Sequence, residues 1–425
     1  MKENGYWESA VEAYAIHETD EYWDNFQANV NPIPAEAFID SWVGDRAVDA
    51  IQSSSSDQPF FLFVGLPNPH MPFDCPEPYA SMYDPANMPI PETFGISFDD
   101  KPPIQAAFKR GGRRVNYEKM DEAKLRQAMA YYYGAVTLVD DQVGKIVAEV
   151  RNQGIEDQTV IAFCSDNGEL LGHYGMLTKS IDEYPILYDV GLRVPMAIGG
   201  AGISPSVVGE PVELIDLCPT LLAAAGLEVA PEIQGLDLSD TFNGRRPDFR
   251  PYVFAESGAV KMIRSERYKL VHYPGQAYGE LYDVAEDPDE TKNMYGDPSF
   301  ADPKGEMTAA LLDRLIHVEG ARHGESKGGR RIGGICTRRR SSRPSLAEIE
   351  GIRPSLDTPF AASQRLRALG MNGVYGNRST CPHNLSLQAV DPSQVSSEDQ
   401  FFSFCSQVQT LDGAFDLDGA VFRQV

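Results

Sequence analysis

Three short apolar segments constrain the fold of this chain most strongly. Residues 60–64, 159–164 and 193–198 are almost wholly apolar, and proline, glycine or polar residues bound each of them. A continuous apolar run of this length predicts a strand that is buried on both faces. Apolar residues spaced by three and four predict helices at 35–51 and 125–150. We therefore expect an α/β fold with a mostly parallel central sheet flanked by helices.

The pattern changes twice along the chain. Residues 1–250 carry the alternating strands and helices, whereas 251–320 hold closely spaced short strands and a final helix, which predicts a small C-terminal antiparallel-sheet subdomain. Residues 322–343 then contain eight Arg or Lys and one Glu among glycines and serines. We expect 321–425 to be a disordered or aberrant tail, because its basic and then serine-rich composition buries little apolar area. An out-of-frame or misjoined translation is the alternative.

Composition excludes some functions. The 425 residues carry a formal net charge of -25, which repels a phosphate backbone and argues against nucleic acid as a partner. No apolar run approaches the ~20 residues that a membrane span needs. The first residues lack the apolar core of a signal peptide, so nothing in them directs export and the location stays open. The six cysteines show no metal spacing, and Cys75, Cys164 and Cys218 are expected to be buried thiols.

A polar turn directly follows the second apolar segment. Its sequence is Cys-Ser-Asp-Asn-Gly-Glu, from Cys164 to Glu169. Sites in parallel α/β sheets form at the carboxyl ends of strands, and hard divalent cations bind carboxylate and amide oxygens. Asp166 and Asn167 are therefore candidate metal ligands. Taken alone, the tripeptide Asp-Asn-Gly also fits an ordinary turn.

The surrounding motifs resemble the sulfatase family of the alkaline-phosphatase superfamily. The turn and the later Arg-Val-Pro segment match the family's pattern, with the loop residue Lys179 between them. Further matches follow the family order: 67–73 (PNPHMPF), 131–144 (YYYGAVTLVDDQVG), 216–222 (DLCPTLL) and 267–290 (RYKL, ELYD and DPDE). Each motif alone is weak, but together they are specific, and the resemblance covers roughly residues 15–318.

The resemblance assigns roles to four residues. It implies that Asp166 and Asn167 bind one divalent cation, calcium in most relatives and magnesium in some, and that Lys179 bridges a sulfate oxygen and the catalytic aldehyde hydrate. His70 is expected to bind the sulfate or protonate the leaving alcohol. A cation, a lysine and a histidine suit a sulfuryl group that spreads negative charge over its oxygens. Without this context, His70 reads as a structural histidine and Lys179 as a solvated surface lysine.

Other residues near these motifs have structural interpretations. Glu169 is expected to support the turn by hydrogen bonding, and His173 is a loop residue. The tyrosines 131–133 are expected to lie in the core and on the surface of the long helix.

The nucleophile of the family is missing from the sequence. The family makes a formylglycine from the Cys or Ser of a C/S-x-P/A-x-R motif, and no Cys or Ser of this chain begins one. The family's first strand, which ends in an Asp-Asp metal pair, has no match either, since Asp140-Asp141 lies within the long helix and Asp99-Asp100 follows no strand. We expect an N-terminally truncated sulfatase whose catalytic half lies upstream.

These observations leave three functions. The first is a sulfuric ester hydrolase acting on a sulfated small molecule or glycan, with formylglycine expected in the family but its motif absent here. The second is a phosphonate or phosphodiester hydrolase of the same superfamily. The third is an inactive sulfate-binding pseudoenzyme. Full-length relatives are often periplasmic, secreted or lysosomal, so the family does not settle the location.

Overall fold

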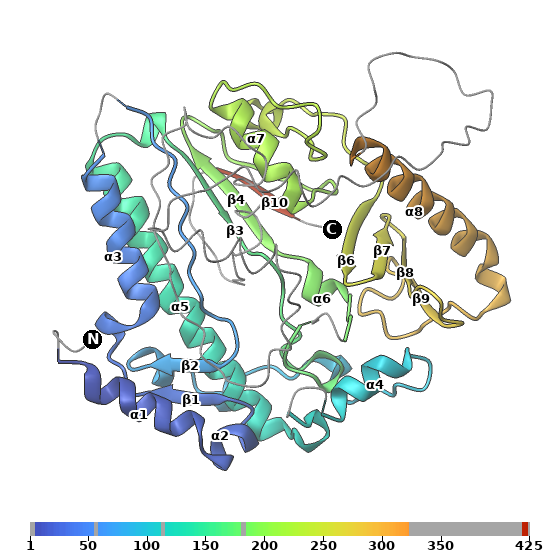
Figure 1. Ribbon diagram of the computed structural model, residues 1–425, viewed down its shortest axis with the longest axis horizontal. Helices are drawn as coiled ribbons and strands as arrows, with labels where there is room; N and C mark the ends of the chain where they lie inside the picture. Colours follow the sequence, from blue (N-terminus) through green and yellow to red (C-terminus); the bar gives the residue numbers. More distant parts are fainter. Residues whose placement is uncertain (1–4, 55–57, 112–114, 180–183, 323–418, 424–425) are drawn as a thin grey trace, which may run out of the picture. The chain divides into compact units, whose positions relative to one another are not determined.

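The structure is a computed structural model that describes residues 5–54, 58–111, 115–179, 184–322 and 419–423. The helices are α1 Trp7–His17, α2 Asp20–Asp24, α3 Ile39–Gln52, α4 Pro103–Lys109, α5 Glu122–Asn152, α6 Asp189–Leu192, α7 Leu217–Ala224 and α8 Ala301–Arg322 (Figure 1). The strands are β1 Ala28–Asn31, β2 Phe73–Pro76, β3 Val160–Cys164, β4 Pro195–Gly200, β5 Ser206–Val208, β6 Val253–Ser257, β7 Val260–Arg264, β8 Tyr268–His272, β9 Gly279–Asp283 and β10 Gly419–Arg423. None of the described helices is long and apolar enough to cross a membrane.

The long helix α5 organises the largest core. Most of its apolar face is buried, and residues such as Leu125, Met129 and Tyr132 pack in one cluster with Phe73 of β2. Val136, Val143 and Ile146 of the same face are partly buried. The helix begins where Asp121 accepts a hydrogen bond from the backbone nitrogen of Lys124 at 2.9 Å, which satisfies one of the free donors of the first turn. The predicted helix at 35–51 forms as α3, which packs against α5.

The central sheet has the order β3-β4-β10-β5. Its strands β3 and β4 form from the predicted segments, but they pair antiparallel, with Ala162 opposite Ile198. The described part of the connection between them holds the 3-10 turn His173–Gly175 and the four-residue helix α6, rather than the long helix that usually joins two parallel strands. The α/β class is therefore confirmed, while this pair departs from the mostly parallel arrangement that we expected. Apolar side chains of β4 form a core with α7 and the segment around Phe242.

The first apolar segment differs from its prediction. Residues 60–66 run as an extended chain with a single bridge at Leu62 and are half-buried rather than buried on both faces. Strand β3 is likewise half-buried along its whole length. The short parallel pair β1–β2 was not predicted from the sequence.

The small C-terminal sheet is confirmed. Strands β6, β7, β8 and β9 form one antiparallel meander, and α8 packs against it through Met307 and Leu311 (Figure 1). Most of the expected tail lies outside the described residues. Its described end forms strand β10, which the sequence did not predict and which pairs antiparallel with β4 and parallel with β5. Of the three cysteines expected to be buried, Cys75 is buried, and Cys164 and Cys218 are partly buried.

Two glycines of α5 give a matched test of this packing. A Cβ at Gly134 would lie 2.3 Å from the carbonyl oxygen of Tyr79, while a Cβ at Gly144 would meet nothing within 4 Å. We expect Gly134→Ala to lower the free energy of unfolding by about 1–3 kcal/mol, because α5 must move away from the loop that carries Tyr79. Gly144→Ala should raise it by about 0.5–1 kcal/mol through helix propensity.

Urea unfolding followed by circular dichroism measures both values. Equal effects of the two substitutions would contradict the close approach of α5 to that loop.

Candidate metal and sulfate half-site

The turn after β3 is held from both sides. The backbone nitrogen of Ser165 donates to the carbonyl oxygen of Pro195 at 3.3 Å, and the nitrogen of Gly168 donates to that of Gly191 at 2.9 Å. The hydroxyl of Ser165 donates to the carbonyl oxygen of Asn167 at 2.9 Å. A Cβ at Gly168 would lie 2.2 Å from the carbonyl oxygen of Val190, so glycine is required there. Residues 165–168, called the metal turn below because they carry the two candidate ligands, are therefore held by the start of β4 and by helix α6.

The two predicted metal ligands present buried oxygens. Oδ1 of Asp166 and Oδ1 of Asn167 are both buried without a hydrogen-bond partner in the described protein. Burial raises the pKa of Asp166 to about 6, and the nearby charge of Lys179 opposes that rise. An unpaired buried oxygen costs about 1–3 kcal/mol, which a cation or a donor from a ligand would offset. These side chains fit a hard cation, because each presents a buried oxygen that no protein donor satisfies.

The oxygens of this pair do not complete a metal centre alone. Calcium takes about 6–8 oxygen ligands. In the described parts of the chain, no group of three or more His, Cys, Asp or Glu side chains is arranged to hold a metal ion. A cation held by Asp166 and Asn167 would therefore need further ligands.

Glu169 supports the loop as predicted. Its buried Oε1 accepts hydrogen bonds from the backbone nitrogens of Leu170, at 3.1 Å, and Lys179. Burial raises the pKa of Glu169 to about 7, and the positive charge of Lys179 acts against this rise. The carboxylate of Glu169 therefore connects the start of the loop, at Leu170, to Lys179.

His70 lies on the loop between α3 and β2. Its Nδ1 contacts the carbonyl oxygen of Met71. A carbonyl can only accept, so Nδ1 carries the hydrogen in this contact and Nε2 is left to exchange a proton with a ligand. Partial burial of the imidazole ring by neighbouring protein atoms lowers the pKa of His70, and the charge of Lys179 lowers it further. The residue as a whole is nevertheless exposed.

Lys179 links three of these residues electrostatically. Its positive charge acts on His70, Asp166 and Glu169, so each of the three lies in the neighbourhood of this one lysine. Asn167 follows Asp166 directly. His70 and the metal turn are therefore both near Lys179, although almost a hundred residues separate them in the sequence.

Sequence reasoning missed the anchor of the His70 loop. Asp40 of α3 is fully buried, and its Oδ1 accepts from the backbone nitrogen of Asn68 at 3.1 Å while its Oδ2 accepts from Nδ2 of Asn68 at 2.6 Å. One signal was available: Asp40 lies on the same helical face as the buried residues Val43, Ala47 and Ile51. A carboxylate on an apolar face needs a partner.

A cavity of about 260 Å³ borders the turn on the side of Gly168 and Glu169. His173, which we expected to be a loop residue, lines this cavity, and its Nδ1 lies 3.0 Å from the hydroxyl of Thr93. Tyr132 and Tyr133 of α5 also line this cavity. Of the three tyrosines, Tyr132 is buried and its two neighbours are partly buried, as expected for core and helix-surface positions.

Two family models and several known proteins match this chain. The family model described as Sulfatase matches residues 3–227, and one described as N-sulphoglucosamine sulphohydrolase, C-terminal, matches residues 182–317. An arylsulfatase of Clostridium perfringens is 25% identical over 69% of this chain and 60% of its own length. A multifunctional alkaline phosphatase superfamily protein, PehA of Trinickia caryophylli, is 29% identical over 68% of this chain and 61% of its own length.

The solved structures give a similar picture. A phosphonate monoester hydrolase from Agrobacterium radiobacter is 26% identical, with a TM-score of 0.58 over 68% of this chain and 62% of that chain. A phosphonate monoester hydrolase from Silicibacter pomeroyi reaches a TM-score of 0.62 at 23% identity, over 75% of this chain and 70% of that chain, which supports the fold. The matches span between 49% and 62% of the length of the arylsulfatase, of PehA and of six further curated relatives.

The buried carboxyl of Asp40 predicts a specific pH dependence. Burial raises the pKa of Asp40 from the usual 3.8 to about 6. The folded state thus holds this proton more tightly than the unfolded state, so the group stabilises the fold below about pH 4 and this contribution is lost as the pH rises through 6. Asn in its place does not titrate.

We therefore expect the difference in unfolding free energy between wild type and Asp40→Asn to be on the order of 2–3 kcal/mol larger at pH 4 than at pH 7.5. Urea unfolding at several pH values measures it. Asp45→Asn, an exposed change on the same helix, is the control. A difference that does not vary with pH would contradict the assignment.

Proposed function

Because the chain belongs to the sulfatase family, we propose that it supplies the metal and sulfate half of a site that cleaves sulfate esters. The observation that carries this proposal is the pair of buried, unpartnered oxygens of Asp166 and Asn167 beside the charge of Lys179. An anionic ester can bind next to carboxylate and amide oxygens only if a cation lies between them. The half-site therefore fits an oxyanion ligand that arrives with a metal ion.

Asp166 and Asn167 would hold the divalent cation. Oxygen ligands select calcium or magnesium over softer metals, and calcium, with its looser geometry, is the first candidate. When bound, the cation would polarise the sulfate and neutralise charge that develops on its oxygens. The residues of this chain hold that ion at the end of β3, where the contacts of Ser165 and Gly168 keep the turn in place.

Lys179 and His70 would act on the substrate. The ammonium group of Lys179 interacts electrostatically with Asp166 and His70. From this position it would hold a sulfate oxygen by a charge-assisted hydrogen bond. His70 has its Nδ1 engaged with Met71, so its Nε2 would bind the sulfate or deliver a proton to the leaving alcohol oxygen as the bond from sulfur to oxygen breaks. Burial and the charge of Lys179 lower the pKa of His70 and so disfavour the protonated form that proton delivery needs, whereas the negative charge of a bound sulfate would favour that form.

The attacking group is not part of this half-site. No Cys or Ser in the 425 residues begins the motif that the family converts to formylglycine. We therefore assign cation binding, sulfate binding and proton delivery to the residues of this chain, and no nucleophilic step.

Sulfated small molecules and glycans are the proposed substrates. Relatives of this chain are named choline-sulfatase, Delta 4,5-hexuronate-2-O-sulfatase and ulvan-active sulfatase. One structural neighbour is a complex with D-glucosamine-2-N,6-O-disulfate. These names cover an alkyl sulfate and several sugar sulfates, so they support the class of ester and not one member of it.

A phosphonate or phosphodiester hydrolase is the second candidate. It is favoured by the likeness to a phosphonate monoester hydrolase at 26% identity. Sulfate and phosphonate esters are both tetrahedral oxyanions, so one cation, one lysine and one histidine suit either of them. A half-site that binds a sulfate ester without turnover, as in a pseudoenzyme, uses the same contacts.

Calcium should stabilise the protein through the predicted ligands. At a calcium concentration of 100 times the dissociation constant, the expected stabilisation is about 2.7 kcal/mol. Asp166→Ala should abolish the calcium-dependent rise in melting temperature and Asn167→Ala should reduce it, because each removes one ligand. Asp157→Ala, a change in the turn that precedes β3, is the control and should respond like the wild type.

Differential scanning calorimetry with calcium, magnesium and chelator measures these shifts. An equal calcium response in wild type and Asp166→Ala would remove the basis of the metal assignment.

Lys179 should contribute to oxyanion binding. In the presence of saturating calcium, we expect Lys179→Met to weaken binding of sulfate on the order of tenfold, which corresponds to the ~1.4 kcal/mol of one charge-assisted hydrogen bond. Calorimetric titration with sulfate, and with methylphosphonate for the second candidate, measures the affinities. Lys145→Met, a change of a surface lysine on α5 that pairs with Asp45, is the control. Unchanged sulfate affinity in Lys179→Met would exclude this role.

A further inference from the structure

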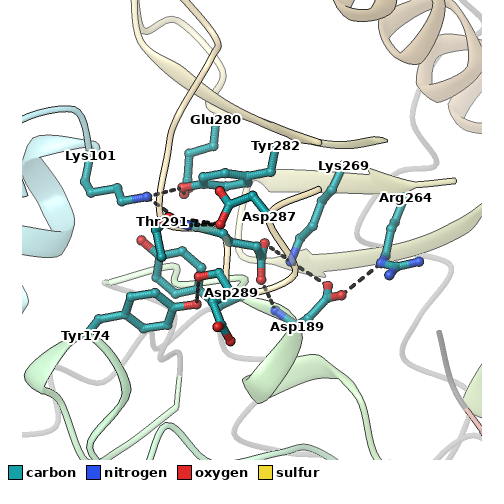
Figure 2. A network of polar contacts seen from close by, with 12 residues as sticks. Lys101, Tyr174, Asp189, Arg264, Lys269, Glu280, Tyr282, Asp287, Asp289 and Thr291 are labelled. Atoms are coloured by element: carbon teal, nitrogen blue, oxygen red, sulfur yellow. Dashed lines mark hydrogen bonds and ion pairs between the residues drawn. The ribbon is translucent and has the colours of Figure 1, made fainter. Parts of the chain in front are cut away.

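A buried network of ion pairs lies behind the metal turn. Oδ2 of Asp189 accepts from Nε of Arg264 at 2.9 Å, and its Oδ1 accepts from Nζ of Lys269 at 2.8 Å. Lys269 also pairs with Oε1 of Glu290 at 2.6 Å. Figure 2 shows the side chains of Asp189, Arg264 and Lys269 converging from α6, β7 and β8. Glu290 belongs to the loop after β9. All four residues are buried, and Lys269 is fully so.

Buried charges of this kind need all their partners. Removing a charge from water is costly, and only close opposite charges and hydrogen bonds compensate for it. Burial alone would raise the pKa of Asp189, but the charges of Lys269 and Arg264 outweigh it and hold the pKa below its usual value. Asp189 is thus an ionised carboxylate held between two cations.

The network fixes the start of helix α6. The backbone nitrogen of Asp189 donates to Oε2 of Glu290 at 2.6 Å, and that of Arg193 donates to the carbonyl oxygen of Asp189 at 2.7 Å. Helix α6 has only four residues. A single turn of helix has little stability of its own, so its place depends on the contacts at its ends.

Helix α6 in turn bears directly on the metal turn. The carbonyl oxygen of Gly191 accepts from the nitrogen of Gly168, and the carbonyl of Val190 leaves no room for a Cβ at Gly168. Gly168 is the next residue after Asn167. A shift of α6 would therefore move the backbone that carries both candidate ligands.

The loop that supplies Glu290 is itself braced. Nζ of Lys101 donates to the carbonyl oxygen of Glu290 at 2.6 Å and to the hydroxyl of Tyr282 at 3.2 Å. The hydroxyl of Tyr174 donates to the carbonyl oxygen of Asp289 at 3.0 Å (Figure 2). Tyr174 belongs to the loop after the metal turn, so the two loops are joined by a second contact.

We propose that Asp189, held by Arg264, Lys269 and Glu290, is a positioning residue that sets the geometry of the Asp166–Asn167 ligand pair through α6. The C-terminal sheet thereby takes part in metal binding without touching the metal. The inference rests on the proposed function for the identity of the ligands. It does not depend on which ester is cleaved.

The test compares two buried ion pairs of the full chain. Asp189→Asn removes the charge beside α6 and keeps the size of the side chain. Asp216→Asn is the matched control, because Asp216 is fully buried and bound by both Nη atoms of Arg250 at 2.6 Å, yet lies next to α7. Two readouts are measured for both variants: amide hydrogen exchange of residues 165–172, and the dissociation constant for calcium.

We expect Asp189→Asn to raise the exchange rate of residues 165–172 at least tenfold and to weaken calcium binding on the order of tenfold, the usual effect of losing an outer partner of metal ligands. Asp216→Asn should leave both values within twofold of the wild type, whatever its loss of melting temperature. If Asp189→Asn does not fold, Arg264→Gln with Arg250→Gln as its control provides the same comparison.

Two results would overturn the inference. One is an unchanged exchange rate at residues 165–172 in Asp189→Asn, and the other is an equal effect of both substitutions. Absence of calcium binding in the wild type together with faster exchange in Asp189→Asn contradicts the proposed metal function and still supports the positioning role. The two claims are therefore separable.

Discussion

The geometry of the candidate site depends on one backbone contact, the hydrogen bond from the nitrogen of Gly168 to the carbonyl oxygen of Gly191. This contact closes the turn after β3 against α6 and leaves the Oδ1 atoms of Asp166 and Asn167 buried without partners. A fold tolerates such oxygens poorly unless a ligand satisfies them. The same closure requires glycine at position 168, so turn geometry and chemistry are set together.

Two buried carboxylates position the two parts of the candidate half-site, the loop of His70 and the metal turn. Asp40 of α3 accepts hydrogen bonds from the backbone and the side chain of Asn68 and so fixes the loop of His70. Asp189 performs the corresponding task for α6 and the metal turn. Neither carboxylate is placed to touch a ligand. Placement by buried polar groups gives geometry that packing alone defines less sharply, at the cost of burying charge.

Helix α5 could be predicted from the sequence because its apolar residues recur at helical spacing. The ordered motifs singled out the turn and the four candidate site residues, whose roles stay predictions. The sequence did not reveal how β3 and β4 pair, since an apolar run is the same in either direction. The partners of Asp189 lie 75 and 80 residues away in the chain, and no local pattern joins them. Strand β10 comes from the region that composition assigned to a tail. Each of these features depends on tertiary contacts.

The central claim is that the oxygens of Asp166 and Asn167 share one cation. Anomalous diffraction from crystals grown with a calcium or terbium salt tests it most directly. The account predicts a peak about 2.3–2.6 Å from Oδ1 of both residues, the usual range of calcium–oxygen distances. A crystal structure without a peak there, in which both oxygens accept hydrogen bonds from protein groups, would contradict it.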